Sequence, residues 1–165
     1  MENLPEKVNT QSVALAIYNP TPGTKAIDIR RQMVQLPEVA KSLSGVEKYI
    51  FAASTKTQIA EIDDATLVAK TGQMFRFIAL DVGYIIPTNT DDWAYICTRL
   101  LDILKKYYSQ MTLADIKLAF ELATTGELDD YLPKDRNGQP DKAHYQQFNA
   151  DYFAKILNAY RRKQN

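Results

Sequence analysis

The sequence predicts a mostly all-α protein, a compact helical bundle preceded by an irregular N-terminal arm. From Thr24 onward, apolar residues recur at three- and four-residue steps, and helix-capping residues stand where several of these runs begin. The arm is indicated by the turn sequence at 19–23, in which prolines fix φ and a glycine adopts conformations that other residues avoid. We therefore expect an arm over residues 1–25 and a single helical domain over residues 26–165.

Shorter helices are predicted first, over residues 24–36 and from Val46 to about Ile59. The segment from about Ala65 to Ile86 is apolar on most sides, which predicts a central helix packed around by its neighbours. Gly72 and Gly83 are points at which that helix can bend or end.

The next helix, over residues 91–108, is the clearest, because carboxylates occupy its first turn and lysines its last. Thr112 and Asp115 form a pattern like a capping box that opens another helix, and Gly126 is its natural stop. A polar, turn-rich stretch follows over residues 129–141. The final helix is predicted from about Lys142 and carries an aromatic and aliphatic face.

Composition limits the classes of function. The 165 residues contain 20 Lys and Arg against 20 Asp and Glu, so nucleic-acid or anionic-membrane binding would need a local patch. The lone cysteine, Cys97, excludes an internal disulfide and suits a reducing compartment, so we expect a soluble, cytoplasmic protein. No apolar run reaches the roughly 20 residues of a membrane span, and residues 1–7 do not resemble a secretory signal.

Catalytic chemistry finds no support in the motifs. One histidine and one cysteine are too few for a zinc site, and the sequence around Lys25 lacks the two spaced glycines of a nucleotide-binding P-loop. The adjacent aspartate pairs stand where helices begin or end, and neighbours in a helix diverge by about 100°. We therefore predict no catalytic residue, no metal, no cofactor and no enzymatic activity.

One candidate binding patch lies at the end of the last predicted helix. Its predicted nucleic-acid-binding residues are Lys155, Tyr160, Arg161, Arg162 and Lys163, which offer phosphate contacts and a stacking surface. Tyr145 and Tyr152 are predicted to contact a partner, because tyrosine is enriched at interfaces. The alternative is that the basic residues complement the helix dipole while the aromatic residues pack in the core.

Two segments carry a family resemblance. Residues 111–128 follow the pattern T-x-x-E/D-I/L-x-x-A-F-x-x-A-x-x-G, and residues 144–161 follow F-S/N-x-x-Y-x-x-x-I/V-L-x-A-Y. Together they delimit a module over residues 111–163 that resembles phage and mobile-element replication accessory proteins of the replisome-organiser or helicase-loader type. The resemblance implies contact with DNA, a replicative helicase, or both. The missing P-loop excludes loaders that carry their own ATPase domain.

Two functions are therefore expected. The first is a non-catalytic replication adaptor that contacts DNA or helicase through its C-terminal helix and N-terminal arm. The second is a protein-only interaction module, such as a virion component or a regulator of a host protein. It predicts a stable homo- or hetero-oligomer without affinity for DNA.

Overall fold

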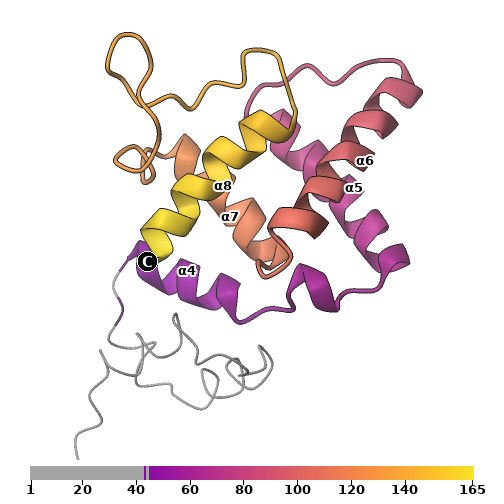
Figure 1. Ribbon diagram of the computed structural model, residues 1–165, viewed down its shortest axis with the longest axis horizontal. Coiled ribbons are helices and arrows are strands. Elements are labelled where there is room, and N and C mark those ends of the chain that lie inside the picture. The colour runs from indigo at the N-terminus through magenta and orange to yellow at the C-terminus, as the bar shows by residue number, and fades with distance from the viewer. Residues whose placement is uncertain (1–42, 44) are drawn as a thin grey trace, which may run out of the picture. The chain divides into compact units, whose positions relative to one another are not determined.

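The computed structural model describes residue 43 and residues 45–165, and the predictions for the arm and for the helix over residues 24–36 lie outside them. The described elements are α4 (Val46–Ser54), the 3₁₀ turn η1 (Ile59–Glu61), α5 (Asp64–Asp81), α6 (Thr90–Tyr107), α7 (Leu113–Thr124) and α8 (Ala150–Gln164) (Figure 1). No strand occurs in this part of the chain, which confirms the predicted all-α class. None of these helices has the length and apolar character that crossing a membrane requires.

The chain divides into two compact units, residues 1–55 and residues 56–165. The first contributes α4, which begins after Gly45, a residue with a φ of 51°. The boundary that the sequence predicts at residue 25 lies outside the described residues. The second unit holds η1 and helices α5 to α8.

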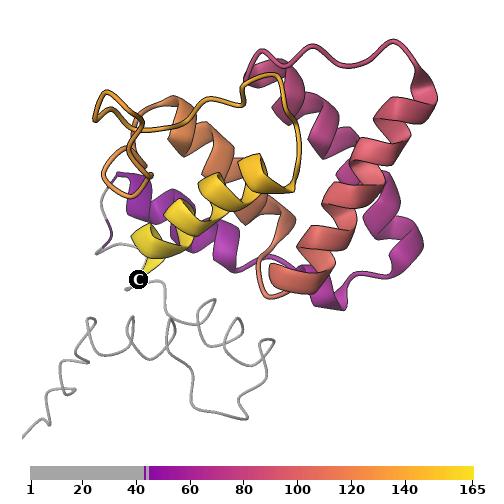
Figure 2. The ribbon, with the colours of Figure 1, turned by 45° about the horizontal axis from the view of Figure 1, so that its top comes forward.

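Four helices of the second unit form a closed ring of neighbours. Helix α5 packs against α6 and α7, and α8 packs against the same two helices (Figures 1 and 2). Aromatic side chains meet inside this arrangement of four helices. The centroid of the Phe153 ring lies 4.6 Å from that of Phe120 and 5.6 Å from that of Phe75. Helix α6 adds Leu100 and Leu104, which are fully buried. The core is therefore shared by all four helices.

Local hydrogen bonds explain where most helices begin. Asp63 accepts from the Thr66 amide at the start of α5, and Asn149 accepts from the Tyr152 amide at the start of α8. The capping box of α7 is confirmed, because Thr112 and Asp115 each accept from the other's backbone amide.

Three helix boundaries differ from the prediction. Helix α4 ends at Ser54 instead of about Ile59, which begins the 3₁₀ turn η1. Helix α5 ends at Asp81 instead of Ile86, because Gly83 adopts a φ of +74° and the chain leaves the helix there. Helix α8 begins at Ala150, eight residues after the predicted start. Tyr145 and Gln146 have φ values of 49° and 57°, which are incompatible with a right-handed helix.

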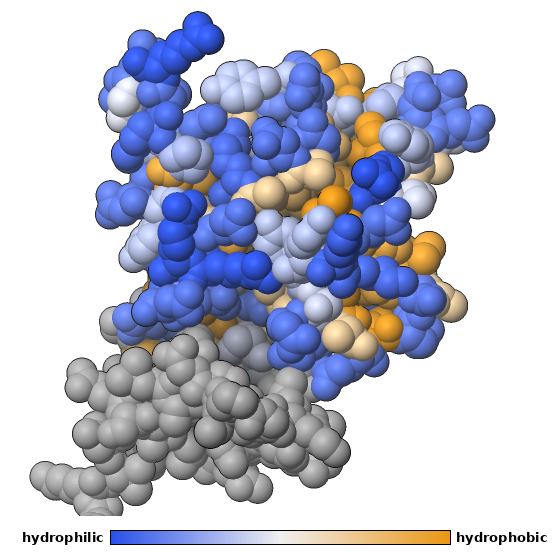
Figure 3. Space-filling view, viewed as in Figure 1, coloured by the Kyte–Doolittle hydropathy of each residue, from blue (hydrophilic) through white to orange (hydrophobic). Residues whose placement is uncertain are grey.

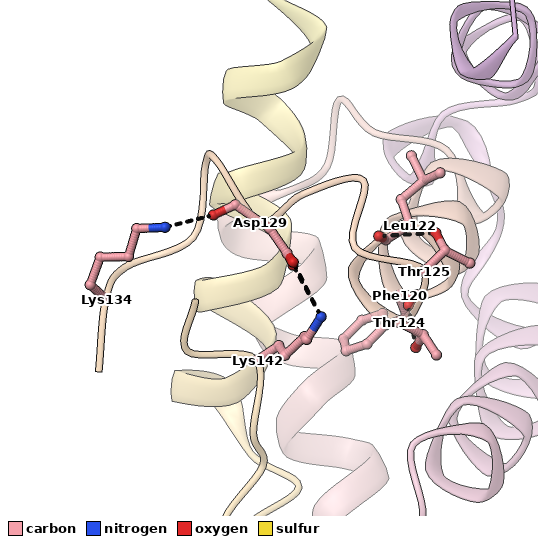
Figure 4. Close-up of polar contacts among 7 residues, drawn as sticks. All are labelled: Phe120, Leu122, Thr124, Thr125, Asp129, Lys134 and Lys142. Carbon is pink, nitrogen blue, oxygen red and sulfur yellow. Dashed lines mark hydrogen bonds and ion pairs between the residues drawn. The ribbon is translucent and has the colours of Figure 1, made fainter. Parts of the chain in front are cut away.

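The connection between α7 and α8 is long and runs beside α8 (Figures 1 and 2). Asp129 holds it together: its carboxylate accepts from Lys142 Nζ at 3.1 Å, and its backbone carbonyl accepts from Lys134 Nζ at 3.2 Å (Figure 4). His144 joins it to the end of α5 through a hydrogen bond between Nε2 and the Val82 carbonyl. The connection is thus fixed by side chains without regular secondary structure.

The burial of helix α5 also differs from the prediction. The prediction of a helix covered on all sides is wrong, because α5 buries one face only. Val68 and Leu80 are each 59% exposed, and Phe77 is 50% exposed. The buried face comprises Leu67, Thr71, Met74, Phe75, Ile78 and Ala79. Large apolar side chains therefore remain on the surface of this helix.

Candidate functional site

Tyr160, which the sequence placed in a nucleic-acid patch, lies in the core. Its side chain is fully buried, and its hydroxyl donates to Asp115 Oδ1 at 2.7 Å. A ring in this position cannot stack on a base, so the predicted stacking role is wrong and the alternative of core packing holds. Burial raises the pKa of Asp115, and hydrogen bonds from Thr112 and Tyr160 offset this only in part.

Lys155 also turns inward. Its side chain is 12% exposed, and Nζ lies 3.1 Å from Asp141 Oδ1 and 2.7 Å from the Ala143 carbonyl. Nζ further lies over the rings of Tyr145 and Tyr152, at 5.3 and 5.7 Å from their centroids. Burial raises the pKa of Asp141, but hydrogen bonds from Lys155 and Tyr145 outweigh it and leave the pKa below its ordinary value. Lys155 therefore anchors the α7–α8 connection, and its predicted phosphate contact is not available in this arrangement.

The two tyrosines predicted to contact a partner differ. Tyr152 is buried, and burial raises its pKa to about 12, so it packs in the core and offers no surface. Tyr145 is 67% exposed, and its hydroxyl donates to Asp141. That hydrogen bond raises the pKa of Tyr145. Only Tyr145 of this pair presents its ring to a partner.

The three basic residues at the end of α8 have partners within the protein. Arg161 donates to the Tyr107 carbonyl at 2.7 Å and lies 4.4 Å from the centroid of the Tyr108 ring. Lys163 pairs with Glu127 at 3.5 Å. Arg162 is exposed and donates only weakly, at 3.3 Å, to the Asn158 carbonyl of its own helix. The most accessible cation of the predicted patch is therefore Arg162.

The family-like pattern coincides with fold-determining positions. In α7 its fixed residues are the capping box, the Gly126 stop with a φ of 87°, and buried side chains. In and before α8 they are the N-cap Asn149 and six buried residues, namely Phe148, Tyr152, Ile156, Leu157, Ala159 and Tyr160. The pattern thus describes how α7 and α8 pack and names no residue of a contact surface.

A groove between α5 and α7 is the feature that sequence reasoning missed. Its volume is about 450 Å³, and it lies entirely within the second unit. Met74, Ile78 and Phe120 form an apolar floor, and the half-exposed Phe77 lies at the rim. The lining residues are Lys70, Gln73, Met74, Phe77, Ile78, Asp81, Val82, Lys117, Phe120, Glu121, Thr124 and Thr125. The sequence did contain a signal for this groove, namely the apolar residues on most sides of α5. A helix has this pattern also when one of its apolar sides binds another molecule.

The two ends of the groove differ in charge. A second hollow, of about 430 Å³, shares Asp81, Val82 and Thr124 with the groove and continues to His144 and Tyr145. The C-terminal ends of α5 and α7 therefore lie at the same end of the groove. Lys70 and Lys117 lie at the other. On the face drawn in Figure 3, apolar surface gathers toward α5 and α6, whereas the surface over α8 is largely hydrophilic.

Reactive groups are few in the described part of the chain. No group of three or more His, Cys, Asp or Glu there is placed to hold a metal ion. Burial raises the pKa of Cys97 to about 11, which keeps it a thiol at neutral pH. The fold and site define a helical protein with an apolar surface groove. No protein-family model matches the chain, and neither a search of curated proteins nor a search of solved structures finds a match.

Proposed function

We propose that this chain is a non-catalytic interaction protein, and that the groove between α5 and α7 is its docking surface. The observation that carries the proposal is Phe77, a large aromatic side chain left half exposed above an apolar floor. Leu80 lies one turn further along α5 and is 59% exposed. Covering both would remove enough apolar surface to contribute about 1–1.5 kcal/mol for each residue. Such exposed apolar patches commonly mark interaction sites.

Site-specific photo-crosslinking tests this docking surface. A benzoylphenylalanine placed at Phe77 should form an adduct with one identifiable protein in cells that express the chain. The same group at Val68 is the matched control, because Val68 is also exposed but lies on the opposite side of α5. Equal adducts at the two positions, or none at Phe77, would contradict the proposal.

The second candidate is a replication accessory protein of a phage or mobile element. The resemblance over residues 111–161 motivates it, and the exposed guanidinium of Arg162 favours a phosphate contact at the end of α8. A replicative helicase would then be the expected protein partner. Tyr145 is the accessible aromatic residue among those predicted for this region.

A salt-titrated DNA shift and a pull-down against a replicative helicase test this candidate. Replacing Arg161, Arg162 and Lys163 together by Ala should weaken DNA binding and reduce its salt dependence. Arg162→Ala alone should account for much of that loss, because Arg161 and Lys163 already contact the protein. Lys134→Ala serves as a control for a lysine elsewhere on the surface. Unchanged DNA binding of the triple variant would rule out the patch.

A further inference from the structure

We propose that the occupant of the α5–α7 groove is a second copy of this chain, bound through a twofold axis with the two α5 helices antiparallel. The inference rests on the docking surface proposed above and names its partner. Twofold interfaces require a surface that is complementary to itself, in which one patch supplies both the inserting side chain and the site that receives it. The groove meets this requirement in charge and in shape.

Charge complementarity comes from the two ends of α5. Lys70 and Asp81 are both exposed, and neither forms an ion pair within the described residues. They are eleven positions apart, which corresponds to about 16.5 Å along the helix. Antiparallel pairing about the midpoint brings each Lys70 opposite Asp81 of the second copy. Parallel pairing would instead place like charges together, which disfavours it.

Lys117 strengthens the same polarity. It lines the groove at the Lys70 end, so Asp81 of the second copy would meet two lysines there. Lys117 has one partner of its own, Glu121, at 3.9 Å, and both side chains are more than half exposed. An exposed pair of this kind contributes little and leaves Lys117 able to turn toward another carboxylate.

Shape complementarity comes from Phe77. The register that pairs Lys70 with Asp81 also places Phe77 opposite Met74 of the second copy, above the apolar floor of its groove. A groove of about 450 Å³ has room for an aromatic side chain. Phe77 is half exposed, so its ring can move away from the edge of the groove without exposing core residues to solvent. Each copy therefore offers an aromatic side chain and a site that accepts one.

Sedimentation equilibrium of the purified full chain over a concentration series tests the proposal. The wild-type chain should be a reversible dimer. Phe77→Asp should weaken the dimer by at least about 30-fold, as expected for a central interface residue. Val68→Asp is the matched control on the opposite side of α5 and should leave the dimer unchanged. Circular dichroism and thermal melting of each variant check that the fold is intact.

A charge-swap series tests the antiparallel register. Lys70→Glu or Asp81→Lys alone should weaken the dimer about fivefold or more, because each places like charges together at both ends of the interface. The two substitutions combined should restore it to within about twofold of the wild-type chain. A monomer at every concentration, or a double variant no better than the singles, overturns the proposal.

The outcomes separate this inference from the docking surface itself. A monomeric chain that still crosslinks another protein from position 77 would refute the twofold dimer and keep the groove as a docking surface. A chain that forms no adduct at position 77 would refute both. A dimer that persists in Phe77→Asp would place self-association elsewhere and likewise refute the inference.

Discussion

Replacing Tyr160 by phenylalanine would remove one hydroxyl from the interior and leave the ring in place. That hydroxyl donates to Asp115 Oδ1 at 2.7 Å, and both residues are buried. The ring itself still packs, so no cavity of consequence forms. The substitution therefore isolates a single buried hydrogen bond to a carboxylate.

The expected cost follows from this geometry. A hydrogen bond to a charged group contributes about 1.5–3 kcal/mol, so Tyr160→Phe should lower the free energy of unfolding by about 2 kcal/mol. Asp115 keeps a hydrogen bond from the Thr112 amide at 3.0 Å and a longer one from Gln164 at 3.4 Å, which limits the loss. For a chain of this length, the melting temperature should fall by about 4–8 °C.

The pH dependence of the loss identifies its cause. Burial raises the pKa of Asp115 in the folded protein above its ordinary value of 3.8. The contribution of Asp115 to stability is therefore fully present below pH 3.8 and is lost as the pH rises through the pKa of the folded state. The Tyr160 hydrogen bond lowers this pKa, so its removal raises the pKa further. The difference in stability between the variant and the wild-type chain should therefore be larger at neutral pH than below 3.8, where Asp115 is protonated.

Urea denaturation followed by circular dichroism, at neutral and at acidic pH, measures this difference. Tyr95→Phe is the matched control, because Tyr95 is 68% exposed and no hydrogen bond of its hydroxyl is found within the described part of the chain. It should change stability by less than about 0.5 kcal/mol. The reasoning is refuted if Tyr160→Phe is no more costly than this control, or if its cost does not depend on pH.

Three further variants test other parts of the fold by the same denaturation assay. Gly72→Ala should stabilise by up to about 1 kcal/mol, because its Cβ meets nothing within 4 Å inside a helix. Gly126→Ala should destabilise by about 1–2 kcal/mol, because φ is +87°. Equal effects at the two glycines would argue against the assigned backbone. Lys155→Met should cost about 1 kcal/mol above pH 3.8. The pKa of Asp141 is lowered in the folded state, so that contribution is lost as the pH falls below 3.8 through the folded value. A Lys155→Met cost that is independent of pH would contradict the role assigned to this pair.

Features governed by local chemistry could be predicted from the sequence. Thr112 and Asp115 form their capping box, Gly126 follows the end of α7, and α6 spans almost the residues expected. Each of these depends on interactions within a few residues, so a single sequence contains the necessary information.

Features governed by neighbours distant in sequence could not be predicted. Periodicity showed that α5 is apolar on most sides, but could not show that no described element covers Phe77. Tyr160 and Tyr145 are the same residue type, and only the packing of α8 against α7 distinguishes the buried Tyr160 from the exposed Tyr145. The late start of α8 depends on Tyr145 and Gln146 in a left-handed conformation that non-glycine residues seldom adopt.

The position of α8 in the chain bears on how the protein is made. Helix α8 supplies Phe153 and Tyr160 to the core that α5, α6 and α7 share, and it follows all three in sequence. During synthesis those helices therefore leave the ribosome before the side chains that cover them exist. Their apolar faces stay open to chaperones or to premature association for that interval. Closure of this unit must await the synthesis of α8, so slow translation of the α7–α8 connection would prolong the vulnerable state.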